Sequence, residues 1–325
     1  MKRIWKELLI AALMGLFLPG VILNVAEMLM GNRREPEIGE SSLQTQTKME
    51  HQGQRLTVLL RQRDGTTREM DMDSYLTGVV LAEMPASFAR EAKKAQAVVA
   101  RTFALKAAVT GGKHGDGSVC TESVCCQAYI PPEDYGGPAE AVDQARSAAE
   151  ETSGQVLTYG EVLIEATYFS CSGGSTESAV AVWGQDYPYL QSVESPGEEG
   201  ATWYSDQKEF TVEEFEQALG VQLTGVPGTW FGVITYTSGG GVNTADICGT
   251  SFRGTELRSK LKLRSTAFTF SASEHGITVH TRGYGHRVGL SQYGADAMAL
   301  AGNDYKKILA HYYPGTTVET YQVNK

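Results

Sequence analysis

Glu83 is the one acid in the apolar run of residues 78–85, GVVLAEMP. Burial disfavours a charged carboxylate, so an acid in such company is usually paired or functional. The run predicts a short helix over residues 74–83, capped by Asp73 or Ser74 and ended by the proline that follows. Glu83 would lie at its C-terminus, where the helix dipole also disfavours negative charge. Both effects raise the pKa of a carboxyl group, as a general acid requires. A salt-bridged helix end explains this stretch equally well.

Arg101 lies in a helix-forming run of alanine and valine, residues 97–104. An arginine in such a run usually extends its stem along the helix and keeps its charge in solvent. The functional alternative is a cation that faces the Glu83 helix and orients a substrate.

Four potential metal ligands lie within thirteen positions of one loop: His114, Cys120, Cys125 and Cys126. Thiolate and imidazole groups are preferred ligands of tetrahedral zinc. Disulfide bonds are the alternative if this part of the chain lies outside a membrane, although five cysteines are an odd number. The spacing alone does not decide between metal and disulfide.

A Gly-Gly turn follows a predicted strand at Ser170, Ser172, Gly173 and Gly174. Such a turn can present backbone N–H groups and hydroxyls to a ligand, or it can simply end a strand. Cys171, within this turn, could act as a nucleophile in a thiol peptidase with His286 as its base, which is a weaker alternative.

The segment of residues 283–294, GYGHRVGLSQYG, is the second informative stretch. Its glycines allow close approach of the backbone to a ligand, and His286, Gln292 and Tyr293 supply polar contacts. No strand–helix dinucleotide unit follows it, which argues against phosphate binding.

The helices and strands that must position these residues are expected to form an α+β fold of mixed helices and antiparallel strands. Hairpins are expected around residues 63–65, 160–161 and 274–276, and residues 195–208 are expected to be loop-like. Further strands are expected at residues 233–237 and 242–247. The other helices are expected at residues 88–109, 139–152, 211–219, 255–261, 291–301 and 305–311.

The N-terminus differs from the rest of the chain. A basic start (residues 1–7) precedes an apolar stretch at residues 8–30 that is long enough to span a bilayer. No clear cleavage site follows, so a retained single-pass anchor is predicted, with the N-terminus in the cytoplasm. Residues 31–53 are predicted to be a flexible stalk. The net charge of −10 and the lack of a basic stripe argue against nucleic-acid binding.

Several motifs in order resemble the stage II sporulation protein D family, which includes modifiers of bacterial wall amidases. The resemblance covers roughly residues 54–320. It rests on LAEMP (81–85), AQAVVART (95–102), SGG (172–174), VWG (182–184), YPYL (187–190), RST (264–266) with Phe268, and the 283–294 segment.

The resemblance implies a membrane-anchored lytic transglycosylase acting on peptidoglycan glycan strands stripped of their stem peptides. Glu83 matches the family's catalytic glutamate and Arg101 an important arginine. A single Glu suffices because the sugar's own 6-hydroxyl replaces water, giving a 1,6-anhydro product. The alternative within the family is a non-catalytic wall-binding scaffold or amidase activator.

The resemblance also implies a setting. Relatives act in the mother-cell membrane, facing the intermembrane space during engulfment, beside a partner amidase of the stage II sporulation protein P type and an associated membrane protein. No organic cofactor is implied.

A clostridial branch binds zinc with a His-x5-Cys-x4-His-Cys pattern, which this chain matches except that Cys125 replaces the second His. A structural zinc with four protein ligands is therefore expected.

We expect a catalytic lobe over residues 54–200, a second lobe over 201–280 and a C-terminal segment over 281–325 that completes a substrate groove.

Overall fold

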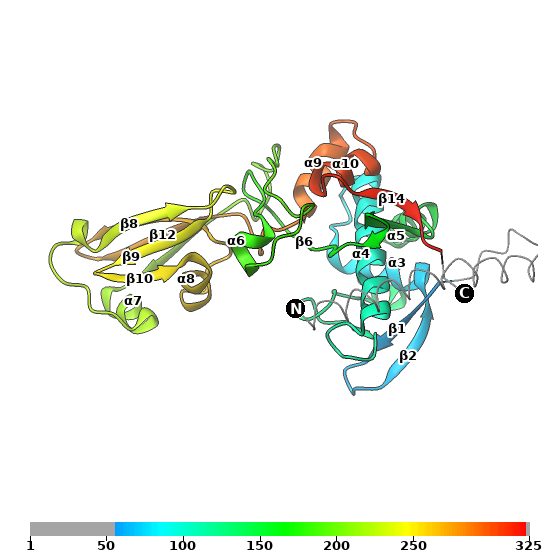
Figure 1. Ribbon diagram of the computed structural model, residues 1–325, viewed down its shortest axis with the longest axis horizontal. Coiled ribbons are helices and arrows are strands. Elements are labelled where there is room, and N and C mark those ends of the chain that lie inside the picture. Colours follow the sequence, from blue (N-terminus) through cyan, green and yellow to red (C-terminus); the bar gives the residue numbers. More distant parts are fainter. Residues whose placement is uncertain (1–55, 323–325) are drawn as a thin grey trace, which may run out of the picture. The chain divides into compact units, whose positions relative to one another are not determined.

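The computed structural model describes residues 56–322. Within this range it contains eight α-helices and five small sheets, and no large parallel sheet covered by helices on both faces (Figure 1). The predicted α+β class is confirmed for this part of the chain. Most strand pairs are antiparallel, as expected, and two are parallel.

The helix that carries Glu83 follows directly from a hairpin. Strands β1 (Thr57–Arg61) and β2 (Thr67–Asp71) pair antiparallel, and β3 (Val119–Cys120) lies parallel to β1. Helix α3 (Met72–Glu83) begins directly after β2, and the side chain of its N-cap, Asp71, accepts a hydrogen bond from the Ser74 backbone N–H. The predicted cap at Asp73 or Ser74 is therefore two or three residues too late. The helix does end at Glu83, as predicted.

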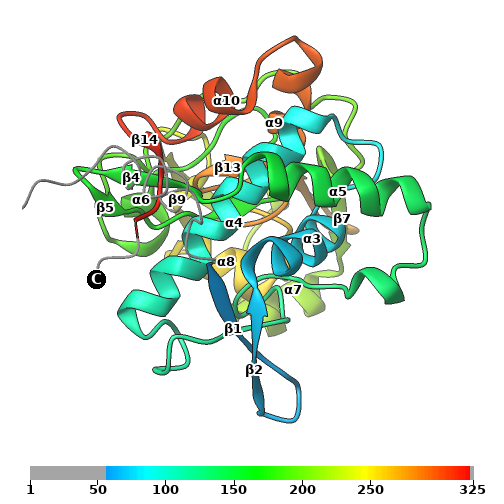
Figure 2. The same ribbon diagram turned by 90° about the vertical axis from the view of Figure 1, so that its right-hand side faces the viewer.

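Helix α4 (Arg90–Thr110) is the centre of the first part of the fold. It contacts α3, α5 (Ala139–Glu151) and the two C-terminal helices, which Figure 2 shows around it. Its alanine-rich sequence favours a helix and allows close packing. Gly111 ends it in the left-handed conformation, with φ of 86°.

The C-terminal residues return to this part of the fold. β6 (Tyr168–Phe169) pairs parallel with β13 (Leu290–Ser291), and β14 (Thr317–Thr320) joins β4 (Gln155–Tyr159), which also pairs with β5 (Val162–Leu163). The remaining elements here are α6 (Ala179–Trp183), α9 (Gln292–Leu300), α10 (Tyr305–Tyr312) and η1 (Pro132–Asp134).

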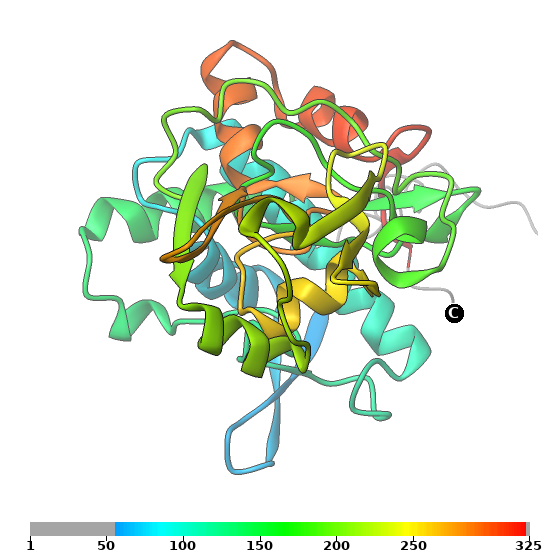
Figure 3. The same cartoon turned by 90° about the vertical axis from the view of Figure 1, so that its left-hand side faces the viewer.

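Residues 205–282 form two further sheets, shown with their helices in Figure 3. Strands β11 (Ala267–Ser273) and β12 (Gly276–Arg282) form the expected hairpin, but β7 (Ser205–Phe210), in a segment predicted to be largely loop, pairs with β12. Charged and polar residues dominate β7, SDQKEF, which explains why a strand was not expected there. The elements are β7 (Ser205–Phe210), α7 (Val212–Leu219), η2 (Pro227–Thr229), β8 (Phe231–Tyr236), β9 (Val242–Ile247), β10 (Thr250–Arg253), α8 (Gly254–Lys260), β11 (Ala267–Ser273) and β12 (Gly276–Arg282).

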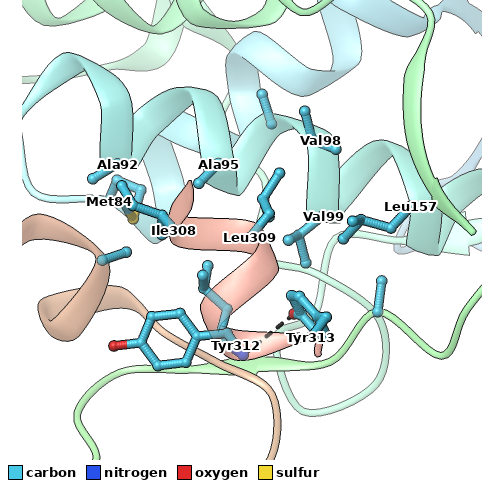
Figure 4. Close-up of a cluster of buried hydrophobic side chains, with 14 of the residues drawn as sticks. Met84, Ala92, Ala95, Val98, Val99, Leu157, Ile308, Leu309, Tyr312 and Tyr313 are labelled. Atoms are coloured by element: carbon cyan, nitrogen blue, oxygen red, sulfur yellow. Dashed lines mark hydrogen bonds between the residues drawn. The ribbon is translucent and has the colours of Figure 1, made fainter. Parts of the chain in front are cut away.

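The buried apolar residues gather in three clusters. The first joins α3 and α4 to the C-terminal elements, and Figure 4 shows Val98 and Val99 of α4 facing Leu309 of α10 and Tyr313, which follows that helix. The second joins α3 and α4 to β1, β3 and β4. The third is built entirely from residues between Phe210 and Val279. The 205–282 segment therefore has a core of its own.

The predicted anchor and stalk, residues 8–30 and 31–53, lie outside the described residues. Among residues 56–322, none of the helices has the length and hydrophobicity needed to cross a bilayer.

Candidate active site

Glu83 is partly buried, and three hydrogen-bond donors hold its carboxylate. The Ala128 backbone N–H and the Tyr168 hydroxyl donate to Oε1 at 2.8 and 3.1 Å, and Gln292 Nε2 donates to Oε2 at 3.2 Å. The donors come from different parts of the fold: the loop after the cysteines, strand β6 and the start of α9. No cation pairs with Glu83 in the described residues, so the salt-bridged alternative is not what the structure contains.

The surroundings of Glu83 favour its protonated form. Burial raises its pKa above 4.5, and the hydrogen bonds from Ala128, Gln292 and Tyr168 offset this only in part. Burial and the neighbouring Glu83 charge raise the pKa of Tyr168 well above 10, so its hydroxyl stays a donor. Glu83 can therefore give up a proton to a leaving group and take one back.

Two residues of this site were missed by the sequence reasoning, Tyr168 and Gln127. The Tyr168 hydroxyl also lies 3.2 Å from Gln127 Oε1, and Gln127 Nε2 donates to the hydroxyl of buried Tyr75 at 3.0 Å. A tyrosine in a strand and a glutamine after two cysteines carry no local signal. Only their proximity to Glu83 distinguishes them.

Arg101 contacts the Glu83 helix at its opposite end. Its fully buried guanidinium pairs with Asp73 at 2.9 Å and donates to the carbonyl oxygens of Ala149 and Gln155. Asp73 precedes Glu83 by ten residues, about 15 Å along the helix. The expectation of a solvent-exposed charge is wrong. The predicted role in orienting substrate stays a prediction, whereas these contacts join α3, α5 and β4.

The Gly-Gly turn is not free to bind a ligand with its N–H groups. The buried carboxylate of Glu198 accepts hydrogen bonds from the backbone N–H of Ser172 and Gly173 and from the Ser172 hydroxyl, at 2.7, 3.0 and 2.9 Å. Gly174 N–H donates to the Ser172 hydroxyl. The turn therefore binds an internal carboxylate, and we did not expect this partner from the sequence.

Cys171 is buried beside the same carboxylate. Its thiol donates to Glu198 at 3.1 Å, and burial and the Glu198 charge raise its pKa strongly. A thiol held in the protonated form is a poor nucleophile, so this environment opposes the thiol-peptidase alternative.

The remaining predicted binding residues lie on either side of β6. Ser170 accepts a hydrogen bond from the Tyr293 backbone through its carbonyl oxygen, and the Tyr293 ring packs edge-on against Phe88. The His286 ring lies 5.6 Å from that of Phe169. Burial and nearby Arg258 lower the pKa of His286 to about 4, so the ring is neutral at pH 7. Of the predicted set, only Gln292 contacts Glu83 directly.

The four predicted metal ligands come together. Their ligand atoms all lie within 4.8 Å of one another; His114 Nε2 is 3.8 Å from Cys125 Sγ and 3.6 Å from Cys126 Sγ, and the two sulfurs are 3.9 Å apart. Tetrahedral zinc with bonds of about 2.0–2.3 Å separates its ligand atoms by about 3.5–3.8 Å. The cluster could therefore hold a metal ion such as zinc. No disulfide joins the five cysteines, all within residues 56–322.

Comparisons with known proteins agree with the motif pattern. The profile of a family described as stage II sporulation protein matches residues 61–159. The chain is 39% identical over 266 residues to stage II sporulation protein D of Bacillus subtilis (strain 168), covering 79% of this chain and 77% of that protein. It is 38% identical to the protein of the same name from Bacillus amyloliquefaciens, with the same coverage. It is also 30% identical to an amidase enhancer of Bacillus subtilis (strain 168), covering 76% of this chain and 40% of that protein.

A carboxyl group with a raised pKa, held by donors from three parts of an α+β fold, makes Glu83 the candidate acid–base residue of this site. The two similarities that cover 79% of this chain name the family more closely. The chain belongs to the stage II sporulation protein D family.

Proposed function

We propose that this protein is a peptidoglycan lytic transglycosylase that acts in sporulation and uses Glu83 as its only acid–base group. The observation that carries the proposal is the Glu83 carboxyl itself: partly buried, with a raised pKa, and bound by neutral donors only. Hydrolysis of a glycosidic bond normally requires two carboxylates. Among the described residues, no carboxylate is one of the groups that shift the pKa of Glu83, which suits a reaction whose nucleophile comes from the sugar.

In the proposed reaction, protonated Glu83 donates its proton to the glycosidic oxygen as the bond from that oxygen to C1 breaks. The 6-hydroxyl oxygen of the same sugar bonds to C1, and its proton passes to the Glu83 carboxylate. The enzyme returns to its starting state, and the product carries a 1,6-anhydro ring. Tyr168 and Gln292 hold the carboxylate in position through both transfers.

Digestion of glycan strands that lack stem peptides, followed by mass analysis, tests this reaction. The full wild-type chain should release anhydro products, and Glu83→Gln should lose about 10³-fold or more of the rate, since no other group replaces the acid. Glu213→Gln, at an exposed position on α7, is the matched control. Undiminished cleavage by Glu83→Gln contradicts the proposal, and a hydrated reducing end indicates a hydrolase instead.

A second candidate function is a wall-binding scaffold that activates an amidase, and the similarity to an amidase enhancer favours it. It predicts that purified protein binds glycan strands without cutting them. Cleavage by the isolated chain therefore separates the two functions.

We further propose that His114, Cys120, Cys125 and Cys126 hold a structural zinc. Four ligands leave no open position, so the ion would stabilise the loop and supply no reactive water. The protein is proposed to work at the outer face of the cell membrane, anchored by residues 8–30, beside a sporulation amidase.

A further inference from the structure

The Tyr168 hydroxyl lies between two acceptors but has only one hydrogen to donate. Its oxygen is 3.1 Å from Glu83 Oε1 and 3.2 Å from Gln127 Oε1. A phenol carries a single O–H bond, so it donates fully to only one of these oxygens at a time. The stronger acceptor of the two therefore receives the hydrogen bond.

Gln127 is fixed with its carbonyl oxygen toward Tyr168. Its Nε2 donates to the Tyr75 hydroxyl at 3.0 Å and to the Ala100 carbonyl oxygen at 3.4 Å. A carbonyl oxygen only accepts hydrogen bonds, so the nitrogen of the amide, and not its oxygen, must face Ala100. The amide therefore cannot turn over without losing this contact, and Oε1 stays available to Tyr168.

Gln127 is also closed off from solvent and from a bound glycan. Its exposed fraction is 0%, whereas the side chains of Glu83 and Tyr168 are both partly exposed. Gln127 can therefore influence a reaction at Glu83 only through its neighbours. It is a positioning residue and not a catalytic one.

The charge of Glu83 decides which acceptor is the stronger. Hydrogen bonds to an ionised group are roughly twice as strong as those between neutral groups, so the Glu83 carboxylate attracts the Tyr168 hydrogen. Protonated Glu83 is a weaker acceptor, and the amide oxygen of Gln127 then becomes the better one. The Ala128 N–H, which donates to Glu83 Oε1 at 2.8 Å, is held by the backbone and cannot turn away in the same manner.

We propose that Gln127 is the second acceptor of a hydrogen-bond switch, in which the Tyr168 hydroxyl turns to Glu83 when that carboxyl is ionised and to Gln127 when it is protonated. No O–H bond breaks, because the hydroxyl only rotates about its C–O bond. The proposal rests on the proposed function, in which Glu83 alternates between the two forms in every cycle. The switch supports the carboxylate without leaving the Tyr168 hydrogen unpaired beside the acid form.

The other titratable groups around this pair keep their charge through the working pH range. Two further phenols, Tyr75 and Tyr313, act on the ionisation of Tyr168. Burial raises the pKa of both above 10, so they stay neutral. Cys120 and Cys126 of the metal cluster act on Tyr75, so the proteins compared in a test must have equal zinc content.

Carbon-13 NMR of the full chain, labelled at the glutamate side-chain carboxyl groups, titrates Glu83 directly, and Glu83→Gln identifies its signal. Gln127→Met keeps a side chain of similar length but removes the acceptor oxygen. The acid form of Glu83 then loses the partner of the Tyr168 hydrogen, so the pKa of Glu83 should fall by about half to one unit. Tyr168→Phe should shift this pKa in the opposite direction.

The direction of the shift separates the switch from a structural role of Gln127. Displacement of its segment would withdraw the Ala128 N–H from the carboxylate and raise the pKa of Glu83. In a Tyr168→Phe chain there is no hydroxyl to turn, so adding Gln127→Met should change the pKa by less than about 0.3 unit. Gln222→Met, at an exposed glutamine, should change nothing.

Glycan cleavage gives a second readout. A lower pKa leaves less of the Glu83 acid form near pH 7, so Gln127→Met should lower kcat by about three- to tenfold. KM should stay the same, because buried Gln127 does not touch the glycan.

A pKa of Glu83 that stays in place or rises in Gln127→Met, at equal zinc content, overturns the switch. Gln127→Leu repeats the titration with an apolar side chain of another shape, so that a packing fault in one variant does not decide the outcome. Failure of the proposed reaction is seen separately, as cleavage that Glu83→Gln leaves intact or as no cleavage by the wild-type chain. The titration of Glu83 still tests the switch in either case.

Discussion

Glu83 is held between two opposing influences, and its reactivity depends on their balance. Burial raises its pKa, whereas the donors Ala128, Gln292 and Tyr168 stabilise the carboxylate and lower it. A general acid must be protonated at the working pH and must also become a carboxylate during the reaction. Three neutral donors meet both needs, because they support the charge without supplying a fixed cation that would keep it ionised.

At this scale, Tyr168→Phe tests the balance. Losing the Tyr168 hydrogen bond removes a contact that favours the carboxylate, so the pKa of Glu83 should rise. The alkaline limb of the pH–rate profile should then move upward by about half to one unit, with a rate loss of about tenfold. Tyr159→Phe, at an exposed tyrosine, is the control. A limb that stays in place contradicts the role of Tyr168.

Glu83 should also affect stability in a pH-dependent way. Because its folded pKa lies above 4.5, the folded state binds the proton more strongly than the unfolded state. Its contribution to stability is therefore present at low pH and is lost as pH rises through the folded pKa. Glu83→Gln should raise Tm by a few degrees at pH 7–8, and the gain should vanish near pH 4. Thermal unfolding at several pH values checks this; a gain that does not depend on pH contradicts it.

At the scale of elements, the turn after β6 is organised around Glu198. Glu198 Oε2 accepts hydrogen bonds from the backbone N–H groups of Ser172 and Gly173. Glu198 Oε1 accepts hydrogen bonds from the hydroxyls of Ser195 and Ser291, both at 2.6 Å. Ser291 is the N-cap of α9, the helix that begins with Gln292. Glu198 therefore fixes the turn and the helix that brings Gln292 to Glu83.

Glu198→Ala should leave these buried donors without a partner and lower the free energy of unfolding by about 3 kcal/mol. Glycan cleavage should fall as well, because α9 loses its support. Glu199→Ala changes an exposed neighbour and should cost less than about 0.5 kcal/mol. Denaturant unfolding compares the two. Equal stability of both variants would show that the Glu198 contacts are not needed.

Most elements could be predicted, because alanine-rich periodicity, glycine caps and hairpin turns are local signals. Helix α4 and the β11–β12 hairpin are examples. Strand β7 was missed because its stability comes from pairing with β12, not from its polar sequence. The same division holds in the site. Glu83 was conspicuous in an apolar run, whereas Tyr168, Gln127 and Glu198 act through contacts between distant segments that no local pattern records.

The metal cluster belongs to the element scale as well, because the loop that carries it ends beside Glu83. Cys126 is followed by Gln127 and Ala128, which contact Tyr168 and Glu83. Purified protein should contain about one zinc per chain, and chelation should lower Tm. Cys125→Ser should weaken zinc retention, whereas Cys248→Ser, outside the cluster, should not. Elemental analysis decides, and a ratio near zero with a disulfide present would remove the zinc proposal.

At the scale of the molecule, residues 56–322 contain separate apolar cores. The third cluster lies wholly within residues 210–279, whereas the other two contain no residue of that range. The connection is polar: buried Arg287 pairs with Glu177 at 3.2 Å and donates to the Gly239 carbonyl, while Glu177 accepts from Gly241 N–H. A polar junction between apolar cores favours partly independent unfolding.

Substitutions in the separate cores should therefore act on different thermal transitions. Phe215→Ala removes a fully buried ring from the third cluster and should lower the free energy of unfolding of residues 205–282 by about 3–5 kcal/mol. Leu157→Ala, in the first cluster, is the reciprocal control. It should lower the free energy of unfolding of the rest of the described chain by about 2–5 kcal/mol. Scanning calorimetry measures both. If each variant lowers one common transition, the polar junction couples the cores into a single cooperative unit. If the two transitions separate, glycan cleavage measured at a temperature between them shows whether the Glu83 site needs residues 205–282 to be folded.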